Sequence, residues 1–327
     1  MRRLFSTSQL NPACAGVSAF TFSRALVRGL SPDFAASALR SGAGAPIDGT
    51  LAAAQHSAYV SALRSLLPEG GVTELVAESG CPDSCFIEDT AVVVGARALL
   101  TSPGAPSRRA EVGKVAEALA AANIKASTCP PGATLDGGDV LYTGREFFVG
   151  LSSRTNAAGA AALGAAFPGL RVTAVPLVAL AASVDRAQSA RLAHATARKQ
   201  RDQQRSNASP LHLKSLVSVV GADTLAVADT PLGNEVAHFL QDSSGVPRDA
   251  RRAGAKLQFV LVPTANAPAA NAVLVNGTLI IRSRKELPEA AEELGEFADA
   301  VGLKVIEREM SELAKADGAL SCCSILF

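Results

Sequence analysis

Two adjacent thiols, Cys322 and Cys323, stand almost at the end of the chain and are the residues best suited to nucleophilic chemistry. They follow an Asp-Gly pair and precede an apolar ending (residues 325–327) that we expect to form a short closing strand. Because neighbouring side chains of a strand point to opposite faces, only one of the two thiols can face a site. Two buried, unreactive cysteines are the alternative, since free cysteines are often core residues.

Carboxylates and a histidine lie at the ends of apolar segments elsewhere in the chain. Glu88 and Asp89 precede one apolar run, Asp136 and Asp139 flank a Gly-Gly pair, and His212 lies between two leucines. Taken singly, these residues also fit a solvated strand end, a turn and a core histidine. They occupy corresponding places in repeated units, however, so we expect them to converge with one thiol on a single site.

Such a set of residues favours a cationic substrate. Carboxylates raise the pKa of a nearby thiol unless the substrate itself brings positive charge. A guanidinium is planar and offers several N–H donors, which suits Asp83, Glu88 and Asp89. Its central carbon would then meet the sulfur. His212, oriented by Asp136, would protonate the departing amine and later activate water.

The elements that must position these residues form a repeating pattern. Four pairs of apolar segments predict hairpins: 89–94 with 97–100, 139–142 with 146–149, 215–220 with 225–228, and 272–275 with 279–281. Helical segments are expected at 110–122, 155–167, 234–241 and 286–300, and residues 20–67 fit a weaker copy of the unit. Even spacing of such units predicts one α/β domain over residues 20–327, closed by radial repetition like a propeller, with its site on the axis.

Two segments depart from this pattern. Residues 1–19 are basic and rich in hydroxyls, which predicts a disordered tail or a transit peptide. Residues 180–209 are basic and Ala-rich, and they lengthen the gap between the second and third hairpins, so we interpret them as an inserted loop.

Composition limits the classes of partner. The net charge of +1, the absence of Trp and the 4% aromatic content argue against a nucleic-acid surface. The longest apolar run, 172–184, is too short to span a bilayer. Six scattered cysteines indicate free thiols in a reducing compartment. We expect a cytoplasmic monomer or homodimer that binds a small molecule, without a cofactor, nucleic acid or membrane partner; the N-terminus makes mitochondrial targeting the alternative.

Several motifs together resemble those of the dimethylarginine dimethylaminohydrolases. They are Phe-Ile-Glu-Asp (86–89), Ala-Pro-Ser-Arg-Arg (105–109), Leu-Asp-Gly-Gly-Asp-Val-Leu (135–141), Leu-His-Leu-Lys-Ser (211–215) and Asp-Gly-Ala-Leu-Ser-Cys-Cys-Ser (317–324). The resemblance implies a five-bladed α/β-propeller of ββαβ-type units with pseudo-fivefold symmetry. It also implies hydrolysis of asymmetric dimethylarginine and monomethylarginine to citrulline and a methylamine, through a thiouronium on the cysteine, which relieves inhibition of nitric oxide synthesis.

Carried over residue by residue, the resemblance implies roles for eleven positions. The catalytic residues would be Cys322, His212 and Asp136. The substrate-binding residues would be Leu39, Asp83, Glu88, Asp89, Arg108, Arg154, Ala316 and Asp317. Glu88 and Asp89 would hold the guanidinium. Arg108 (or its neighbour Arg109) and Arg154 would clamp the α-carboxylate, and the carbonyls of Leu39 and Ala316 would receive the α-amine. No metal is required, although Cys322 with His212 is suited to capture an inhibitory zinc ion.

Other functions remain as alternatives. An arginine deiminase or an amidinotransferase would share the fold and the thiol chemistry, but arginine deiminases typically carry an acid where this chain has Lys214. A non-catalytic propeller scaffold is a second alternative. A zinc protein is a third, because Cys81 and Cys85 have a spacing that suits zinc, although no second ligand pair accompanies them.

Overall fold

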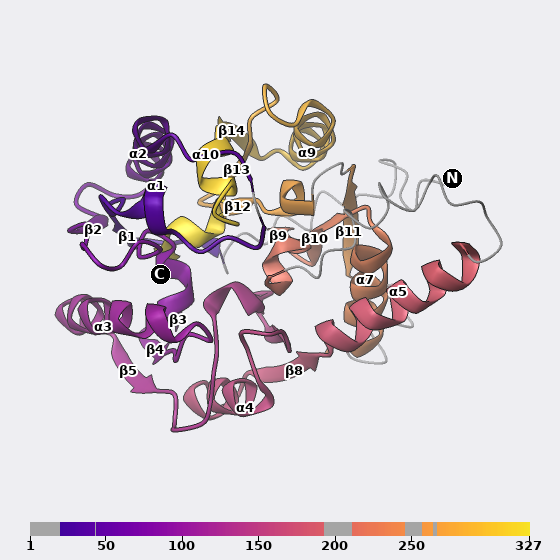
Figure 1. The fold of residues 1–327 in the computed structure, drawn as a ribbon, viewed down its shortest axis with the longest axis horizontal. Coiled ribbons are helices and arrows are strands. Elements are labelled where there is room, and N and C mark those ends of the chain that lie inside the picture. The colour runs from indigo at the N-terminus through magenta and orange to yellow at the C-terminus, as the bar shows by residue number, and fades with distance from the viewer. Residues whose placement is uncertain (1–19, 43, 193–210, 246–256, 264–266) are drawn as a thin grey trace.

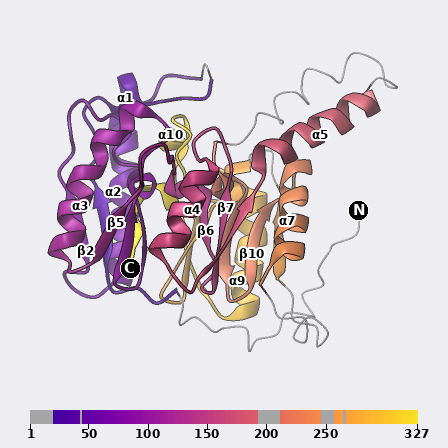
Figure 2. The same cartoon turned by 90° about the horizontal axis from the view of Figure 1, so that it is seen from below.

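The computed structural model describes residues 20–42, 44–192, 211–245, 257–263 and 267–327. The predicted N-terminal tail and residues 193–209 of the predicted insert lie outside this description. The first part of that insert belongs to helix α5 (Leu177–Leu192), which extends beyond the sheets (Figure 2). Within the described residues, no helix combines the length and the apolar character needed to cross a membrane.

The described strands form five separate sheets of three strands each, and none is closed on itself (Figure 1). In every sheet the middle strand pairs antiparallel with one neighbour and parallel with the other. The fold is therefore α/β with mixed sheets. The sheets are β15 (Ile325–Leu326), β1 (Ala25–Arg28), β2 (Val72–Leu75); β3 (Ala91–Val94), β4 (Arg97–Leu100), β5 (Lys125–Thr128); β6 (Val140–Tyr142), β7 (Glu146–Gly150), β8 (Arg171–Val175); β9 (Val217–Gly221), β10 (Thr224–Ala228), β11 (Gln258–Val262); and β12 (Val273–Val275), β13 (Thr278–Arg282), β14 (Lys304–Arg308).

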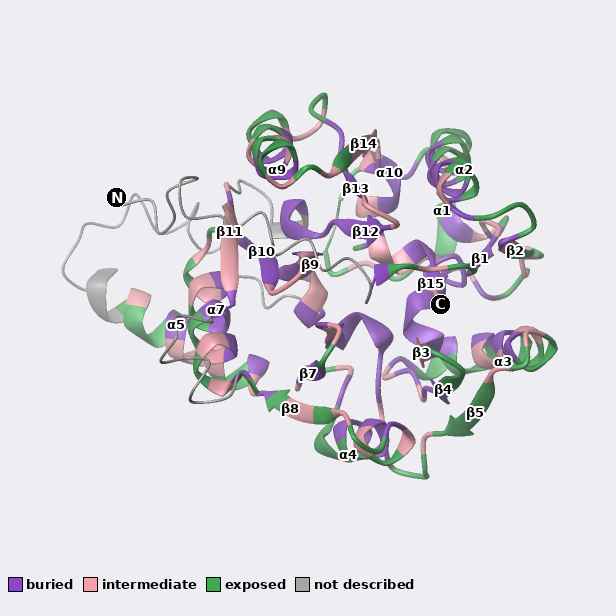
Figure 3. Cartoon of the chain, turned by 180° about the vertical axis from the view of Figure 1, so that it is seen from behind, coloured by how far each residue is buried: buried purple, intermediate pink, exposed green. Residues whose placement is uncertain are grey.

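A helix lies in the connection between the two parallel strands of each sheet, because parallel strands need a long crossover. These helices are α2 (Gly49–Leu66), α3 (Val112–Ala121), α4 (Ala157–Ala166), α7 (Pro231–Ser243) and α9 (Pro288–Val301). They surround the sheets with their outward faces exposed, whereas buried residues gather toward the middle (Figure 3). The short elements that lie between them are α1 (Phe34–Ser37), α10 (Ser311–Ala314), η4 (Ile87–Thr90), η5 (Pro106–Glu111), η6 (Gly137–Asp139), η7 (Leu213–Ser215), η8 (Ala267–Ala270) and η9 (Ser321–Cys323).

The four predicted hairpins are confirmed as antiparallel pairs. The third strand of each sheet was not predicted. Strand β5 illustrates the reason, since all four of its residues are exposed and it lacks the apolar pattern of a core strand.

Some predicted local conformations are wrong. Three predicted strand starts lie in the 3₁₀ turns before the strands: Asp89 in η4, Asp139 in η6 and Ser215 in η7. The two thiols occupy one turn of η9, and the strand begins only at Ile325. Alternation along a strand therefore does not separate Cys322 from Cys323, and their environments must be compared directly.

The last strand pairs with the first, which ties the C-terminal segment into the fold. Ala25 lies opposite Leu326 in an antiparallel pair, and the carbonyl oxygen of Phe327 accepts bonds from two backbone N–H groups of the first segment. The hydroxyls of Tyr59, on α2, and Ser324 lie 2.8 Å apart, and both side chains are buried. The turn that carries the thiols is therefore held by contacts far away in sequence.

We expect Tyr59→Phe to lower the free energy of unfolding by about 1–3 kcal/mol, because Ser324 would lose its buried partner. Denaturant unfolding of Tyr59→Phe, Ser324→Ala and the double variant measures the coupling. The double variant should cost clearly less than the sum of the single variants. Strict additivity would show that this hydrogen bond does not anchor the C-terminal segment.

Candidate active site

A cavity of about 140 Å³ opens beside the turn that carries Cys322. Every predicted site residue except Glu88 lines it. The full lining is Leu39, Arg40, Ser41, Asp83, Phe86, Asp89, Arg108, Asp136, Arg154, Leu211, His212, Ala316, Asp317, Gly318 and Cys322. These residues come from segments spread over most of the chain, and the fold brings them together.

His212 is held in this cavity by a buried carboxylate. Its Nε2 lies 2.9 Å from Oδ2 of Asp136, whose Oδ1 accepts a 2.7 Å bond from the backbone N–H of Gly104. Burial lowers the pKa of His212, but the carboxylates of Asp89, Asp139 and Asp136 outweigh it and raise this pKa to about 9. The imidazole therefore carries a proton at neutral pH, which suits a general acid.

The Gly-Gly pair in front of this histidine is required by space. A Cβ on Gly137 would lie 1.9 Å from the carbonyl oxygen of Glu88, and one on Gly138 would lie 2.7 Å from Nδ1 of His212. The backbone N–H of Gly138 also donates a 2.8 Å bond to Oδ1 of Asp89. The pair thus lets the backbone approach the site more closely than other residues would.

Asp139 was expected near the site but was given no catalytic or substrate-binding role, and it holds two of the site's segments in place. Its Oδ1 accepts a 2.9 Å bond from the backbone N–H of Leu213, next to His212. Its Oδ2 accepts a 2.6 Å bond from Ser152, whose hydroxyl accepts a 3.0 Å bond from the N–H of Arg154. Burial raises the pKa of Asp139 to about 6. The only signal in the sequence was its place in the Asp-Gly-Gly-Asp motif.

Asp89 and Arg108 form a buried ion pair below the cavity. Nη1 of Arg108 lies 2.5 Å from Oδ2 of Asp89, and Nη2 lies 2.9 Å from Oε2 of Glu111, which was not predicted. Nη2 also donates to the carbonyl oxygen of Phe86. Burial raises the pKa of Asp89, but His212, Arg108 and the Gly138 N–H outweigh it and bring this pKa to about 2. Most donors of Arg108 are therefore engaged with the protein.

Arg154 differs from Arg108. It is half-buried and lines the cavity, and its guanidinium makes no hydrogen bond or ion pair with any other residue in the described part of the chain. Arg40 also lines the cavity, but it donates to backbone carbonyls. Arg109 is exposed, donates to the carbonyl of Pro103 and does not line the cavity. Arg154 is thus the cation best placed to meet an anionic group of a ligand.

The two thiols have different environments. Cys322 is half-buried and lines the cavity, whereas Cys323 is 0% exposed and its Sγ faces the carbonyl oxygen of Ala319 at 3.7 Å. Burial, together with the negative charges of Glu88 and Asp89, raises the pKa of the Cys322 thiol. The thiol therefore keeps its proton until positive charge approaches.

The remaining predicted residues form the rim of the cavity. Oδ1 of Asp83 accepts a 3.0 Å bond from the N–H of Leu39. Oδ2 of Asp317 accepts bonds of 2.6 and 2.7 Å from the N–H and hydroxyl of Ser41. Ala316 lines the cavity between them. These bonds hold the segment of Leu39 against the segment that leads to Cys322.

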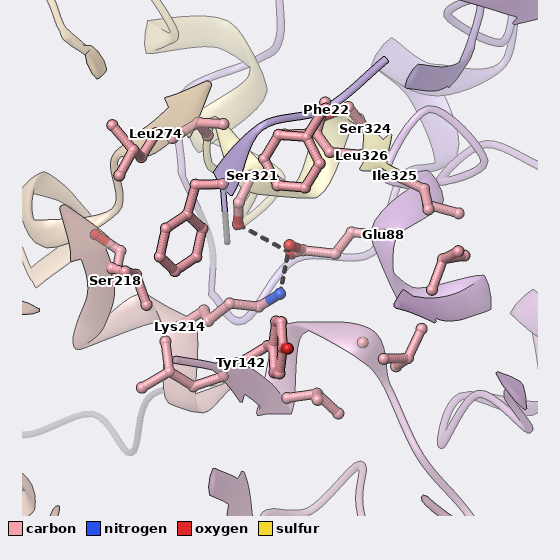
Figure 4. Close-up of a pocket in the computed structure, with 18 of the residues that line it drawn as sticks. Phe22, Glu88, Tyr142, Lys214, Ser218, Leu274, Ser321, Ser324, Ile325 and Leu326 are labelled. Atoms are coloured by element: carbon pink, nitrogen blue, oxygen red, sulfur yellow. Dashed lines mark hydrogen bonds and ion pairs between the residues drawn. The ribbon is translucent and has the colours of Figure 1, made fainter. Parts of the chain in front are cut away.

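Glu88 lines a second cavity, of about 190 Å³, and not the cavity that Cys322 lines. Its Oε1 lies 2.5 Å from Nζ of Lys214, and its Oε2 lies 3.0 Å from the hydroxyl of Ser321 (Figure 4). Neither partner was predicted as a site residue, although both stand in motifs that carry catalytic residues. The second cavity is mostly apolar, and Glu88 and Lys214 are the charged residues in its lining.

One group of side chains in the described part of the chain could hold a metal ion. Ligand atoms of Asp89, Asp136 and His212 lie within 4.8 Å of one another. All three side chains already bond to protein groups, as described above. Cys81 and Cys85 are buried and belong to no such group among the described residues, so the zinc-protein alternative has no structural support.

Comparisons with known proteins agree with this geometry. No family model matches the chain. It is 32% identical over 305 residues to an N(G),N(G)-dimethylarginine dimethylaminohydrolase of Streptomyces coelicolor. The aligned region covers 92% of this chain and 96% of that protein. A crystal structure of the Pseudomonas aeruginosa enzyme, a Cys-to-Ser mutant in complex with citrulline, superposes with a TM-score of 0.68 at 25% identity, covering 94% of this chain and 100% of that one.

A cyanobacterial arginine dihydrolase domain shares the fold, with a TM-score of 0.66 at 17% identity over 93% of this chain and 96% of that one. The identity to the Streptomyces protein extends over almost the whole length of both chains. The chain therefore belongs to the N(G),N(G)-dimethylarginine dimethylaminohydrolase family.

Proposed function

We propose that this protein is a hydrolase that cleaves the C–N bond of Nω-methylated arginines, releasing citrulline and dimethylamine or methylamine. Cys322 is the nucleophile, His212 the general acid and base, and Asp136 its orienting partner. The observation that carries the proposal is that His212, held by Asp136, and the thiol of Cys322 line one cavity bordered by carboxylates. Removal of methylarginines would relieve their inhibition of nitric oxide synthesis.

The charges of the site favour a guanidinium ligand. Asp83 and Asp89 both line the cavity, and the charge of Glu88, which lines the second cavity, also acts on Cys322. A bound guanidinium would bring positive charge next to Cys322 and so lower the pKa of a thiol that these carboxylates hold high. The substrate thus activates its own nucleophile, and the thiol proton leaves to solvent.

The reaction then runs in two halves. The thiolate attacks the central guanidinium carbon, the C–N bond to the methylated nitrogen breaks, and His212 gives its proton to the departing amine. A thiouronium remains on Cys322. Neutral His212 next takes a proton from water as the oxygen attacks the same carbon. Expulsion of the thiolate and loss of the remaining hydroxyl proton to solvent yield citrulline, and the thiolate regains a proton from solvent.

The two arginines divide their tasks. Arg154 would hold the α-carboxylate of the substrate, since its guanidinium makes no hydrogen bond or ion pair with another described residue. Arg108 would contact the substrate with at most some of its guanidinium N–H groups, because Asp89 and Glu111 engage the others. The backbone around Leu39 and Ala316, at the rim, would receive the α-amine.

We also propose that residues 20–327 form one five-bladed α/β-propeller with pseudo-fivefold symmetry, in which each sheet is a blade. All five sheets have the same strand order. Their first strands, β3, β6, β9, β12 and β15, all contribute to the lining of the second cavity, as expected for inner strands around one axis.

The proposal is tested by citrulline release from asymmetric dimethylarginine, with arginine as the competing substrate. We expect Cys322→Ser to abolish release, because the hydroxyl is a far weaker nucleophile, and Cys323→Ala to keep most of it. A higher rate with arginine would favour the deiminase. Equal losses in both variants, with both folded, would show that the nucleophile is misassigned.

The proposed acid also predicts the alkaline limit of the reaction. Only protonated His212 can donate to the amine, so kcat should fall as the pH rises through about 9. Asp136→Asn removes a charge that raises this pKa and should move the limit to lower pH. The measurement is the dependence of kcat on pH for each variant. Glu117→Gln, which changes an exposed acid of α3, is the control whose alkaline limit should stay where it is. An unmoved limit in Asp136→Asn contradicts the assignment.

The proposed carboxylate contact predicts a change in substrate binding. Arg154→Ala should raise KM for dimethylarginine about ten- to a hundredfold, because a charge-assisted hydrogen bond contributes about 1.5–3 kcal/mol. N-methylguanidine lacks the carboxylate, so its rate should barely change in the same variant. If both substrates suffer equally, Arg154 acts elsewhere.

A further inference from the structure

Asn271 is a buried residue between η8 and β12 whose side chain joins separate parts of the site. It is 1% exposed. Its Nδ2 donates a 3.0 Å bond to the carbonyl oxygen of Lys214 and a 2.9 Å bond to the hydroxyl of Ser321. Its Oδ1 accepts a 3.0 Å bond from the backbone N–H of Ser321. One amide therefore connects the segment after His212 with the turn that contains Cys322.

The chemistry of these partners fixes the direction of each bond. A backbone N–H can only donate and a carbonyl oxygen can only accept, so the amide of Asn271 has one orientation that satisfies both. The hydroxyl of Ser321 accepts from Nδ2, which leaves its single proton for Oε2 of Glu88 at 3.0 Å. Asn271 thus directs the Ser321 hydroxyl toward the carboxylate.

Glu88 is consequently held from both of its oxygens by residues that Asn271 anchors. Lys214 contacts Oε1 and Ser321 contacts Oε2, as the dashed lines in Figure 4 show. Ser321 directly precedes Cys322 in the chain. A shift of the amide would therefore move the carboxylate and the sulfur relative to each other.

We propose that Asn271 is a positioning residue that sets the sulfur of Cys322 in register with the Glu88 carboxylate, so that a cationic amidine carbon is presented to the thiolate. The inference rests on the proposed function in that Glu88 holds the guanidinium. It adds a residue that touches neither the substrate nor the reacting atoms. Its loss should impair the selective reaction of Cys322 with cations more than its reaction with neutral reagents.

The test compares alkylation of Cys322 by 2-chloroacetamidine, a cation, and by 2-chloroacetamide, its neutral counterpart. In both reactions the sulfur displaces chloride and the thiol proton goes to solvent; mass spectrometry identifies the modified residue and its rate. We expect the ratio of the two rates to fall at least about tenfold in Asn271→Asp and in Asn271→Leu, as the loss of a hydrogen bond to a charged group predicts. The Leu variant shows whether the charge added by Asp matters.

Asn276→Asp is a matched control. Asn276, in the turn between β12 and β13, also accepts one backbone N–H and donates to two carbonyls, but its partners are Phe22 and Leu66. Its rate ratio should stay within about twofold of the unmodified protein, given that positioning depends on the site contacts of Asn271. If Asn271→Leu does not fold, Ser321→Ala replaces it, since that change removes the hydroxyl between Asn271 and Glu88 without adding charge.

Three results would overturn the proposal: an unchanged ratio in the Asn271 variants, a fall in Asn271→Asp alone while the uncharged variant is normal, or an equal fall in Asn276→Asp. The readout needs no turnover. If the unmodified protein released no citrulline from dimethylarginine, the proposed function would fail while the alkylation ratio would still decide the role of Asn271.

Discussion

The arrangement of this site follows from the burial of several carboxylates close together. Asp89, Asp136 and Asp139 are each at most 2% exposed, and an ionised carboxylate in such a place needs a cation or N–H donors. Arg108, protonated His212 and backbone N–H groups meet that need for these three acids. Each cation is held by the acids it neutralises, so removal of one member leaves the others buried and unpaired.

The same charge balance explains the chemistry that the site can perform. The carboxylates raise the pKa of His212, which prepares an acid, and they also raise the pKa of Cys322, which prepares a thiol and not a thiolate. A neutral ligand would leave the nucleophile protonated. A guanidinium would correct both the charge and the protonation state, so selectivity for cations and activation of the sulfur have one physical origin.

The position of the Glu88 carboxylate depends on hydrogen bonds between residues from distant segments. The Glu88 carboxylate accepts hydrogen bonds from Lys214 in one motif and Ser321 in another. The Asn271 side chain bonds to both Lys214 and Ser321. The closing pair of strands β1 and β15 then holds the C-terminal turn against the rest of the molecule. Contacts with such long sequence separation require the whole fold, because no local segment contains both partners.

The sequence by itself determined which chemical groups are present and which segments carry them. The four hairpins, the helices between them and the motifs around Asp136, His212 and Cys322 were all evident from local patterns of polarity, glycine and turn residues. Local patterns did not reveal the third strand of each sheet; β5, for example, is exposed along its whole length and lacks an apolar face. They also misassigned the thiol turn, because one turn of 3₁₀ helix and a strand are both compatible with Ser-Cys-Cys-Ser.

Only the tertiary structure decided how these groups are used. It paired Arg108 with Asp89 and Glu111, whereas the guanidinium of Arg154 makes no hydrogen bond or ion pair with another described residue. The sequence had assigned both arginines to the same carboxylate clamp. The tertiary structure also brought Lys214 beside Glu88 and Asn271 beside Lys214 and Ser321, and no local pattern predicts these contacts. The physical reason is that burial and hydrogen-bond partners, which set pKa values and available donors, are properties of contacts between segments far apart in the chain.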